Sequence, residues 1–270
     1  MTCGARITML GTGSAFVTRC YNTCFVLHDT CGAMLVDAGG GNGVLCQMED
    51  AGIAMADIHD LFVTHCHTDH ILGTVWVVRK VVQLAKAGDS AARLAVHAHG
   101  KALDTVQALC SLTLAPKDMA IASERVTLHR LEDGDAFAVG GMEVRCFDIR
   151  STKERQFGFR ATLASGRSVV CLGDEPFNEA NRPVARDADW LMHEAFCLHA
   201  DSGRFKPYEK HHSTALDAGR DAASLGAGGL IIYHTEDKTL ATRKEAYAAE
   251  AATAFGGRIV VPDDLEVIPL

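Results

Sequence analysis

The sequence predicts an α+β fold in which two β-sheets pack face to face with helices on the outside. Short apolar segments that end in Gly-rich turns alternate with longer segments of helical pattern, and this succession occurs twice along the 270 residues. No linker or low-complexity stretch divides the chain. Because sheets and helices each bury one apolar face, this arrangement covers both sheets. We therefore expect residues 1–270 to form a single domain.

The first half of the chain contains five predicted strands and three predicted helices. Apolar segments closed by Gly, Asp or His predict strands over 6–15, 22–29, 33–39, 60–65 and 93–99. Helical length and a terminal Gly predict helices over 41–52 and 71–88, and a further helix follows residue 99.

The second half repeats this alternation. Strands are predicted over 125–131, 135–149, 157–163, 167–174, 189–196, 228–234 and 258–264. Ala-rich segments predict helices over 214–226 and 243–257.

Composition narrows the class of protein. The formal net charge of −8 does not favour nucleic acid as a partner. The N-terminus lacks the pattern of a signal peptide, and no apolar run approaches the length of a membrane span. Together with ten cysteines in no paired framework, this predicts a cytoplasmic protein with reduced thiols. Cys20, Cys24 and His28 share one strand face, but about 13 Å across four residues favours buried thiols over a zinc site.

The stretch "THCHTDH", residues 64–70, predicts a metal site between a buried strand and a helix. On an extended backbone His65 and His67 project to one side while Cys66 points away. Asp69 and His70 then fall at the helix start, turned towards a second point. Imidazole and carboxylate suit zinc, and also iron or manganese. The pattern therefore predicts ligands for two neighbouring ions.

"HCHTDH" resembles the H-x-H-x-D-H signature of the metallo-β-lactamase superfamily. The order "LMHEAF", "HHSTALDAG", "GGLIIYHTED" and "IVVPDDLEVI" is similar to the ribonuclease Z-like branch, which includes small phosphodiesterases. The resemblance extends over nearly the whole chain. It implies a four-layer αβ/βα sandwich of two mixed sheets, with the site at one edge of both.

The same resemblance implies further site residues. Asp174 would bridge two ions, and His234 would complete the second site, so that the metal ligands are His65, His67, Asp69, His70, Asp174 and His234. One or two zinc ions would produce a hydroxide nucleophile, which Asp69 would orient. His193 would donate a proton to the leaving oxygen, with Glu194 orienting its ring.

One usual ligand is missing. The family places a third histidine for the first ion six residues before the glycine of an aromatic-Gly-aromatic strand. Counting back from Gly158 leads to Thr152, a weak neutral oxygen. The first site could keep three ligands plus water, or a single ion could be held at the second site. His97 or His99 could compensate by folding inward, although a structural or surface role is favoured for each.

Two neighbouring segments leave alternatives open. Arg150, Lys153 and Arg155 are either a solvated charge run or a clamp for an anion at the site mouth. His212, Ser213 and Thr214 precede an Ala-rich helix and either cap it or contact the substrate; the resemblance implies that this loop faces the site.

The function expected is metal-dependent hydrolysis of a small anionic phosphodiester. Transfer RNA processing is disfavoured, because only a short hairpin fits between Gly158 and Asp174 where an RNA-gripping arm would lie. The alternatives are hydrolysis of a lactone, thioester or other carbonyl ester, and a non-catalytic metal- or ligand-binding role that follows from Thr152. Relatives are often dimers, so a homodimer is also considered.

Overall fold

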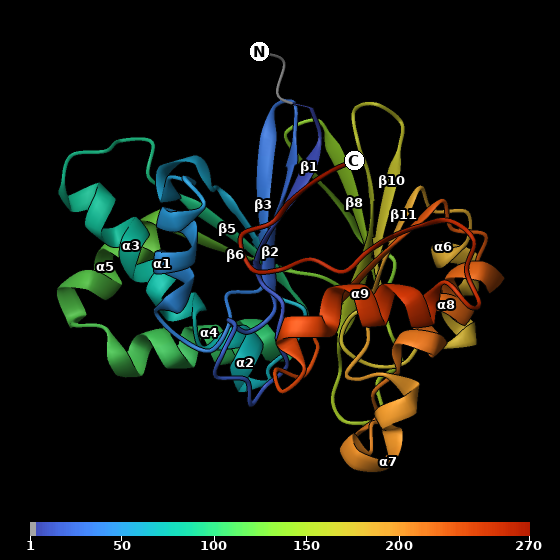
Figure 1. The fold of residues 1–270 in the computed structure, drawn as a ribbon. Helices are drawn as coiled ribbons and strands as arrows, with labels where there is room; N and C mark the ends of the chain where they lie inside the picture. Colours follow the sequence, from blue (N-terminus) through green and yellow to red (C-terminus); the bar gives the residue numbers. More distant parts are fainter. Residues whose placement is uncertain (1–3) are drawn as a thin grey trace.

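The structure is a computed structural model that describes residues 4–270, and it contains two seven-stranded mixed sheets lying face to face (Figure 1). The first sheet has the order β14-β1-β2-β3-β4-β5-β6. In chain order its strands are β1 (Arg6–Gly11), β2 (Cys24–Asp29), β3 (Gly32–Val36), β4 (Asp60–Phe62), β5 (Leu94–Ala98), β6 (Val126–Arg130) and β14 (Val267–Pro269).

The second sheet has the order β13-β12-β11-β10-β9-β8-β7. Its strands are β7 (Ala136–Val139), β8 (Met142–Asp148), β9 (Phe157–Thr162), β10 (Ser168–Cys171), β11 (Trp190–Glu194), β12 (Gly229–Tyr233) and β13 (Arg258–Val260). Each sheet has an antiparallel part and a parallel part, which in the second sheet runs from β10 to β13.

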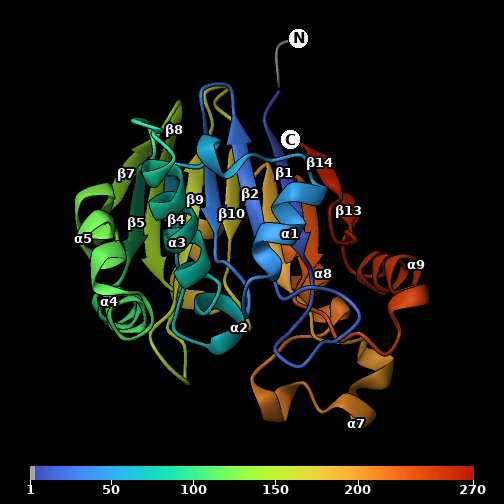
Figure 2. The same cartoon turned by 90° about the vertical axis from the view of Figure 1, so that its left-hand side faces the viewer.

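Helices cover the outer face of each sheet and complete four layers (Figures 1 and 2). The first sheet carries α1 (Gly43–Asp50), α3 (Thr74–Lys86), α4 (Gly100–Thr113) and α5 (Pro116–Arg125), and the second carries α6 (Arg182–Ala185), α8 (Ala215–Ser224) and α9 (Leu240–Ala251). Two short helices, α2 (Thr68–Ile71) and α7 (Ser202–Phe205), lie at the lower end of both views.

Three apolar clusters hold these layers together. The central one lies between the sheets, where the edge-to-face pair of Phe62 and Phe159 has its ring centroids 5.4 Å apart. The outer two lie between each sheet and its helices. The predicted four-layer αβ/βα sandwich is therefore confirmed.

Three features of the fold differ from the sequence prediction. The single strand expected over 135–149 is two antiparallel strands, β7 and β8, joined by a turn at Gly140 and Gly141. The single helix expected after residue 99 is two helices, because Pro116 starts α5 and the backbone before a proline is biased away from helical geometry. The C-terminal segment forms an additional strand, β14, which pairs with β1 at the edge of the first sheet.

The nine cysteines within residues 4–270 are all unpaired, and Cys3 lies outside the described residues. Cys20, Cys24 and His28 do not form a group of potential metal ligands there. Within the same residues, no helix combines the length and apolarity required to cross a membrane.

Candidate active site

The predicted metal ligands gather at one end of the sandwich, where the carboxyl ends of parallel strands from both sheets meet. The histidine stretch follows β4 in the first sheet, Asp174 follows β10, and His234 follows β12 in the second. Strand ends that lie at the same edge bring side chains far apart in sequence into one place. The pocket there is lined by residues that follow strands of both sheets.

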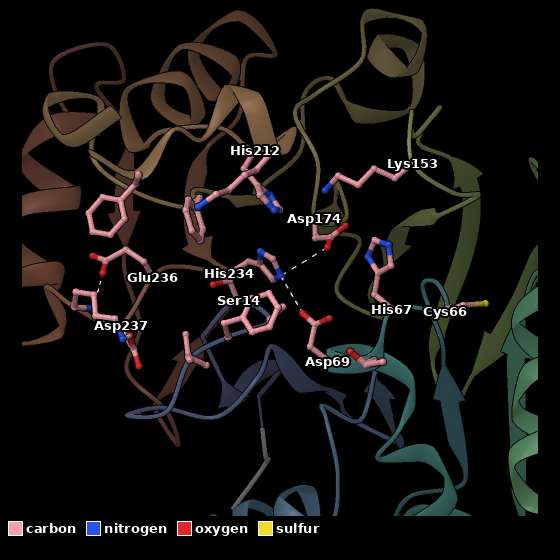
Figure 3. Close-up of a pocket in the computed structure, with 18 residues that line it drawn as sticks. Ser14, Cys66, His67, Asp69, Lys153, Asp174, His212, His234, Glu236 and Asp237 are labelled. Atoms are coloured by element: carbon pink, nitrogen blue, oxygen red, sulfur yellow. Dashed lines mark hydrogen bonds and ion pairs between the residues drawn. The ribbon is translucent and has the colours of Figure 1, made fainter. Parts of the chain in front are cut away.

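Asp69, His70, Asp174 and His234 form one cluster of ligand atoms, and it matches the predicted second site. Nε2 of His70 lies 3.3 Å from Asp69 Oδ2 and 3.6 Å from Asp174 Oδ2. Nε2 of His234 lies 3.5 and 3.7 Å from the same two oxygens (dashed lines in Figure 3). Neighbouring ligands of one zinc ion stand about 3 to 3.6 Å apart, so this spacing fits a single ion.

His65, His67 and Asp174 form another group of potential ligands, and this group corresponds to the predicted site of the first ion. Nε2 of His65 lies 3.5 Å from Asp174 Oδ2 but only 2.8 Å from Nδ1 of His67. The shorter distance is that of a hydrogen bond rather than of two tetrahedral zinc ligands, about 3.3 Å apart. Cys66 points away from the pocket, with its thiol 3.6 Å from Thr105 Oγ1 (Figure 3).

Asp37, which the sequence analysis did not assign, orients two of these imidazoles. It accepts hydrogen bonds from Thr64 Oγ1 and His70 Nδ1, both at 2.7 Å. Since the Thr64 hydroxyl proton goes to Asp37, its oxygen accepts from His65 Nδ1 at 2.8 Å. Both histidines therefore direct Nε2 at the site. Asp37 directly follows β3, at the edge where β4 delivers the histidines, and that position was the available sequence signal.

Burial and charge act against each other within the cluster. Burial disfavours the charged form of His70, but Asp69 and Asp37 outweigh it and raise its pKa. Burial likewise opposes ionisation of Asp174, but His65 and the other histidines hold its pKa well below the usual range. Burial lowers the pKa of His65, which stays neutral and able to act as a ligand.

Backbone conformation marks the same place. Asp37 and His234 have φ angles of 55° and 59°, in the left-handed region that non-glycine residues rarely adopt. Such residues cost of order 1–3 kcal/mol each and persist where the surroundings demand them. Here the turn after each strand aims a carboxylate or an imidazole at the cluster.

The donor set fits a metal ion. Nε2 of His70, both ring nitrogens of His234 and Oδ1 of Asp174 are buried without a hydrogen-bond partner. Leaving such atoms unpaired is costly in a folded protein, and a bound cation would satisfy them. Two imidazoles and two carboxylates are a donor set suited to zinc, iron or manganese.

The segment with the missing histidine is turned to other contacts. Thr152 Oγ1 lies 3.1 Å from His211 Nδ1, and its backbone N–H donates to Glu175 at 3.2 Å. Neither His97 nor His99 replaces it. His97 pairs with Asp60 at 2.9 Å, and His99 packs against Phe157. Neither belongs to a group of potential ligands among residues 4–270.

Glu194 and His212 lie beside His234, a member of the cluster that also contains Asp69, His70 and Asp174. The Glu194 carboxylate accepts the backbone N–H of Ser213 and lies 3.4 Å from Nδ1 of His212. The His212 ring packs against that of His234, with centroids 5.2 Å apart. Burial disfavours a charged His212, but contact with Glu194 outweighs it and raises its pKa. The pair is thus placed to hold a proton beside the ligands.

His193 does not take the position expected of a proton donor. It is fully buried, with Nδ1 on the carbonyl oxygen of Glu194 and Nε2 3.1 Å from Asp221 on α8. Successive side chains of a strand point to opposite faces, so when Glu194 faces the site His193 faces the helix. The role predicted for His193 does not fit this placement, and Glu194 orients His212 instead.

Thr214 is buried and caps α8. Its hydroxyl oxygen accepts the backbone N–H of Asp217, and the Asp217 carboxylate accepts the backbone N–H of Thr214, which together form a reciprocal capping box. Ser213 is also buried, and only His212 of the three predicted substrate contacts lines the pocket. Of the two alternatives that the sequence left open, helix capping or substrate contact, Thr214 therefore takes the capping role.

The pocket above the cluster has a volume of about 780 Å³. Its polar wall includes His67, Asp69, Asp174, His212 and His234 (Figure 3). The remaining wall is largely apolar and contains Phe16, Phe196 and Phe205. Its charged members are Lys153, Lys210 and Lys238 together with Glu236 and Asp237. A small substrate with one anionic and one apolar part matches these surfaces.

Fold and site together define a metal-dependent hydrolase of the metallo-β-lactamase superfamily, in its ribonuclease Z-like branch. Ribonuclease Z of Mycobacterium marinum is 29% identical, with 96% of each chain covered. The metallo-β-lactamase fold protein YhfI of Bacillus subtilis superposes with a TM-score of 0.80 at 18% identity, covering 97% of this chain and 98% of that one. Human tRNase Z, short form, gives 0.75 at 20% identity, with the same coverage.

A more particular assignment comes from a family model described as anti-Pycsar protein Apyc1, which matches residues 5–210. The chain belongs to this family. The matched segment includes the histidine stretch, Asp174, Glu194 and the 149–156 segment, and it ends before His212 and His234.

Proposed function

We propose that this chain hydrolyses a small phosphodiester at a centre built around the Asp69, His70, Asp174 and His234 cluster. The observation that carries the proposal is the convergence of buried, unpartnered ligand atoms beside the Glu194–His212 pair, in one pocket. We assign zinc as the metal, because the donors and their spacing suit it. When bound, such an ion activates water near neutral pH and neutralises charge on the attacked group.

The residues of the chain supply the remaining requirements. Asp69, at the start of α2, belongs to the cluster, and its carboxylate can also orient the attacking water. His212, with its pKa raised by Glu194, would give its proton to the leaving oxygen. Phe196, which stacks on the His212 ring, borders the space for the leaving group. His65 and His67, which lie beside Asp174, would either fix the position of its carboxylate or bind a second ion.

A phosphodiester is favoured over a carbonyl ester by the charge of the pocket wall. Lys153 and Lys210 border the pocket in a protein of net charge −8, whereas the third lysine there, Lys238, pairs with Asp237 at 2.8 Å. A phosphodiester is anionic throughout hydrolysis, whereas a lactone or thioester is neutral before attack. Lysine is a common binder of phosphate groups.

The substrate we propose is small rather than an RNA. The hairpin from β9 to β10 turns through residues 163–167 only, so no long arm projects there. The net negative charge also opposes binding of a polyanion. Two further properties remain predictions from the sequence: location in the cytoplasm, expected for a protein with unpaired thiols, and assembly into a homodimer.

The test is turnover of bis(p-nitrophenyl) phosphate, compared with a lactone and a thioester panel, by the zinc-loaded protein. We expect turnover of the diester and loss of about a hundredfold in Asp174→Asn, since its carboxylate lies beside His65 of one ligand group and beside His70 and His234 of the other. Asp60→Asn, which alters a partly buried Asp–His pair outside this pocket, is the matched control. Turnover of carbonyl esters alone, or full activity in Asp174→Asn, would contradict the proposal.

A further inference from the structure

The segment that lacks the expected histidine, residues 149–156, carries three cations, and the structure separates them. Arg150 pairs with Asp133 at 2.7 Å, outside the pocket. Arg155 pairs with Glu132 and Asp148 at 3.0 and 3.2 Å. Lys153 alone of the three lines the pocket. The two arginines therefore belong to a solvated charged surface, whereas Lys153 belongs to the wall of the pocket.

Lys153 extends towards the pocket region that contains Asp174 and His212 (Figure 3). Its side chain is 26% exposed, and the nearest carboxylate oxygen with which it pairs, on Glu175, lies 3.8 Å from Nζ. That distance is too long for a hydrogen bond. The ammonium group thus keeps donors available to a molecule in the pocket.

Glu175 holds the turn that presents this lysine. It is buried, accepts the Ser151 hydroxyl at 2.7 Å and the Thr152 N–H at 3.2 Å. Since Glu175 directly follows Asp174, the turn is anchored to the strand end that carries the shared metal ligand. The position of Lys153 relative to the cluster is consequently set by two hydrogen bonds on a buried carboxylate.

The charges explain why a lysine fits here. The group of His65, His67 and Asp174 contains two imidazoles that are joined by a hydrogen bond. Its one carboxylate, that of Asp174, also lies beside His70 and His234 of the other group. Because Thr152 stands where a third imidazole is expected, this group has only three protein ligands and holds a divalent ion weakly. A fixed cation nearby both disfavours a second ion and supplies positive charge that the substrate would otherwise lack.

We propose that Lys153 binds a non-ester oxygen of the substrate phosphate and takes over the charge-neutralising role of the first ion, so that the chain works with one tightly bound ion. This inference rests on the proposed function, because it assigns a binding residue to the same site. It makes Lys153 a specificity-determining residue for anionic, phosphate-containing substrates.

The test uses zinc-loaded, desalted protein with inorganic phosphate as the probe. Titration calorimetry should show phosphate binding about tenfold or more weaker in Lys153→Met than in the unchanged protein, because a charge-assisted hydrogen bond is lost. Lys153→Arg should recover most of the affinity, and Arg150→Met should leave it unaltered. Metal analysis should find one tight zinc equivalent in all four proteins, so that weaker phosphate binding is not loss of metal.

Two results would overturn the inference: two tight zinc equivalents in the unchanged protein, or equal phosphate affinity in Lys153→Met. Failure of the proposed function would give a different result from failure of this inference. If phosphate affinity depends on Lys153 but no phosphodiester is turned over, the inference stands and the assigned reaction falls. If bis(p-nitrophenyl) phosphate is turned over with the same KM and kcat by Lys153→Met, the reaction stands and the inference falls.

Discussion

At the scale of single residues, the proton-holding part of the site is a contact between neighbours on different segments. Glu194 ends β11, whereas His212 lies in the loop before α8, and the two side chains come within 3.4 Å. His193, adjacent to Glu194 in sequence, faces the opposite side of the strand and contacts Asp221. Sequence adjacency pointed to His193, whereas strand alternation puts Glu194 on the side of His212 and His193 on the other side.

The first prediction concerns pH. The charge of Glu194 raises the pKa of His212, so the acid form is present below that pKa and is lost as pH rises through it. Glu194→Gln should lower this pKa, and the alkaline limb of kcat for bis(p-nitrophenyl) phosphate should move to lower pH. Asp221→Asn, which alters the partner of His193, should leave the limb in place. The opposite pattern would return the acid role to His193.

At the scale of elements, the start of α8 connects structure to the site. The Thr214–Asp217 capping box closes the helix N-terminus, and the residue before it, Ser213, gives its N–H to Glu194. Cys197 and Thr214 form an isolated bridge that joins the same loop to the end of β11. A helix cap thus fixes the loop that carries His212.

The second prediction follows from that cap. Thr214→Ala should lower the free energy of unfolding by about 1 kcal/mol, the usual cost of removing an N-cap hydroxyl. Urea unfolding of the zinc-loaded protein measures it. Thr113→Ala, at an exposed threonine near the end of α4, should change stability by only a few tenths of a kcal/mol. A higher KM for the diester at undiminished stability would instead identify Thr214 as a substrate contact.

At the scale of the whole molecule, the ligand cluster joins the two sheets. Asp69 and His70 arrive from the first sheet, and Asp174 and His234 from the second. Asp37 and Thr64 brace the first-sheet side, and Phe157 N–H, on the second sheet, donates to the Thr64 carbonyl oxygen at 3.0 Å. An ion that binds all four ligands therefore connects both halves of the sandwich.

The third prediction concerns metal removal. Because the ion binds only the folded arrangement, zinc at a hundred times its Kd should stabilise the protein by about 2.7 kcal/mol. Thermal unfolding after chelation and after zinc is added back would show the gain as a rise in Tm. Asp60→Asn should keep the full rise, and His234→Ala should lose most of it. A Tm independent of zinc would mean that the cluster holds no ion.

Much of this protein could be predicted from the sequence because its signals are local. Periodicity and Gly-rich turns predicted the layers, and the spacing in "THCHTDH" predicted that His65 and His67 lie on one side with Cys66 away. Nε2 of His65 indeed lies 2.8 Å from Nδ1 of His67, and Figure 3 shows the Cys66 side chain directed away from His67. The approach of Asp174 and His234 was implied by resemblance, and the geometry brings both to the cluster. The break before Pro116 was equally local but was overlooked.

The sequence by itself determined the kinds of ligand and the layers, since these depend on side-chain chemistry and on periods of two or 3.6 residues. Only the tertiary structure decided which side chains meet. It placed Asp37 behind two imidazoles, turned His193 away, brought His212 to Glu194 and directed Lys153 inward while Arg150 and Arg155 found acidic partners outside. Such contacts depend on strand register and on turns between distant segments, which no short stretch of sequence encodes.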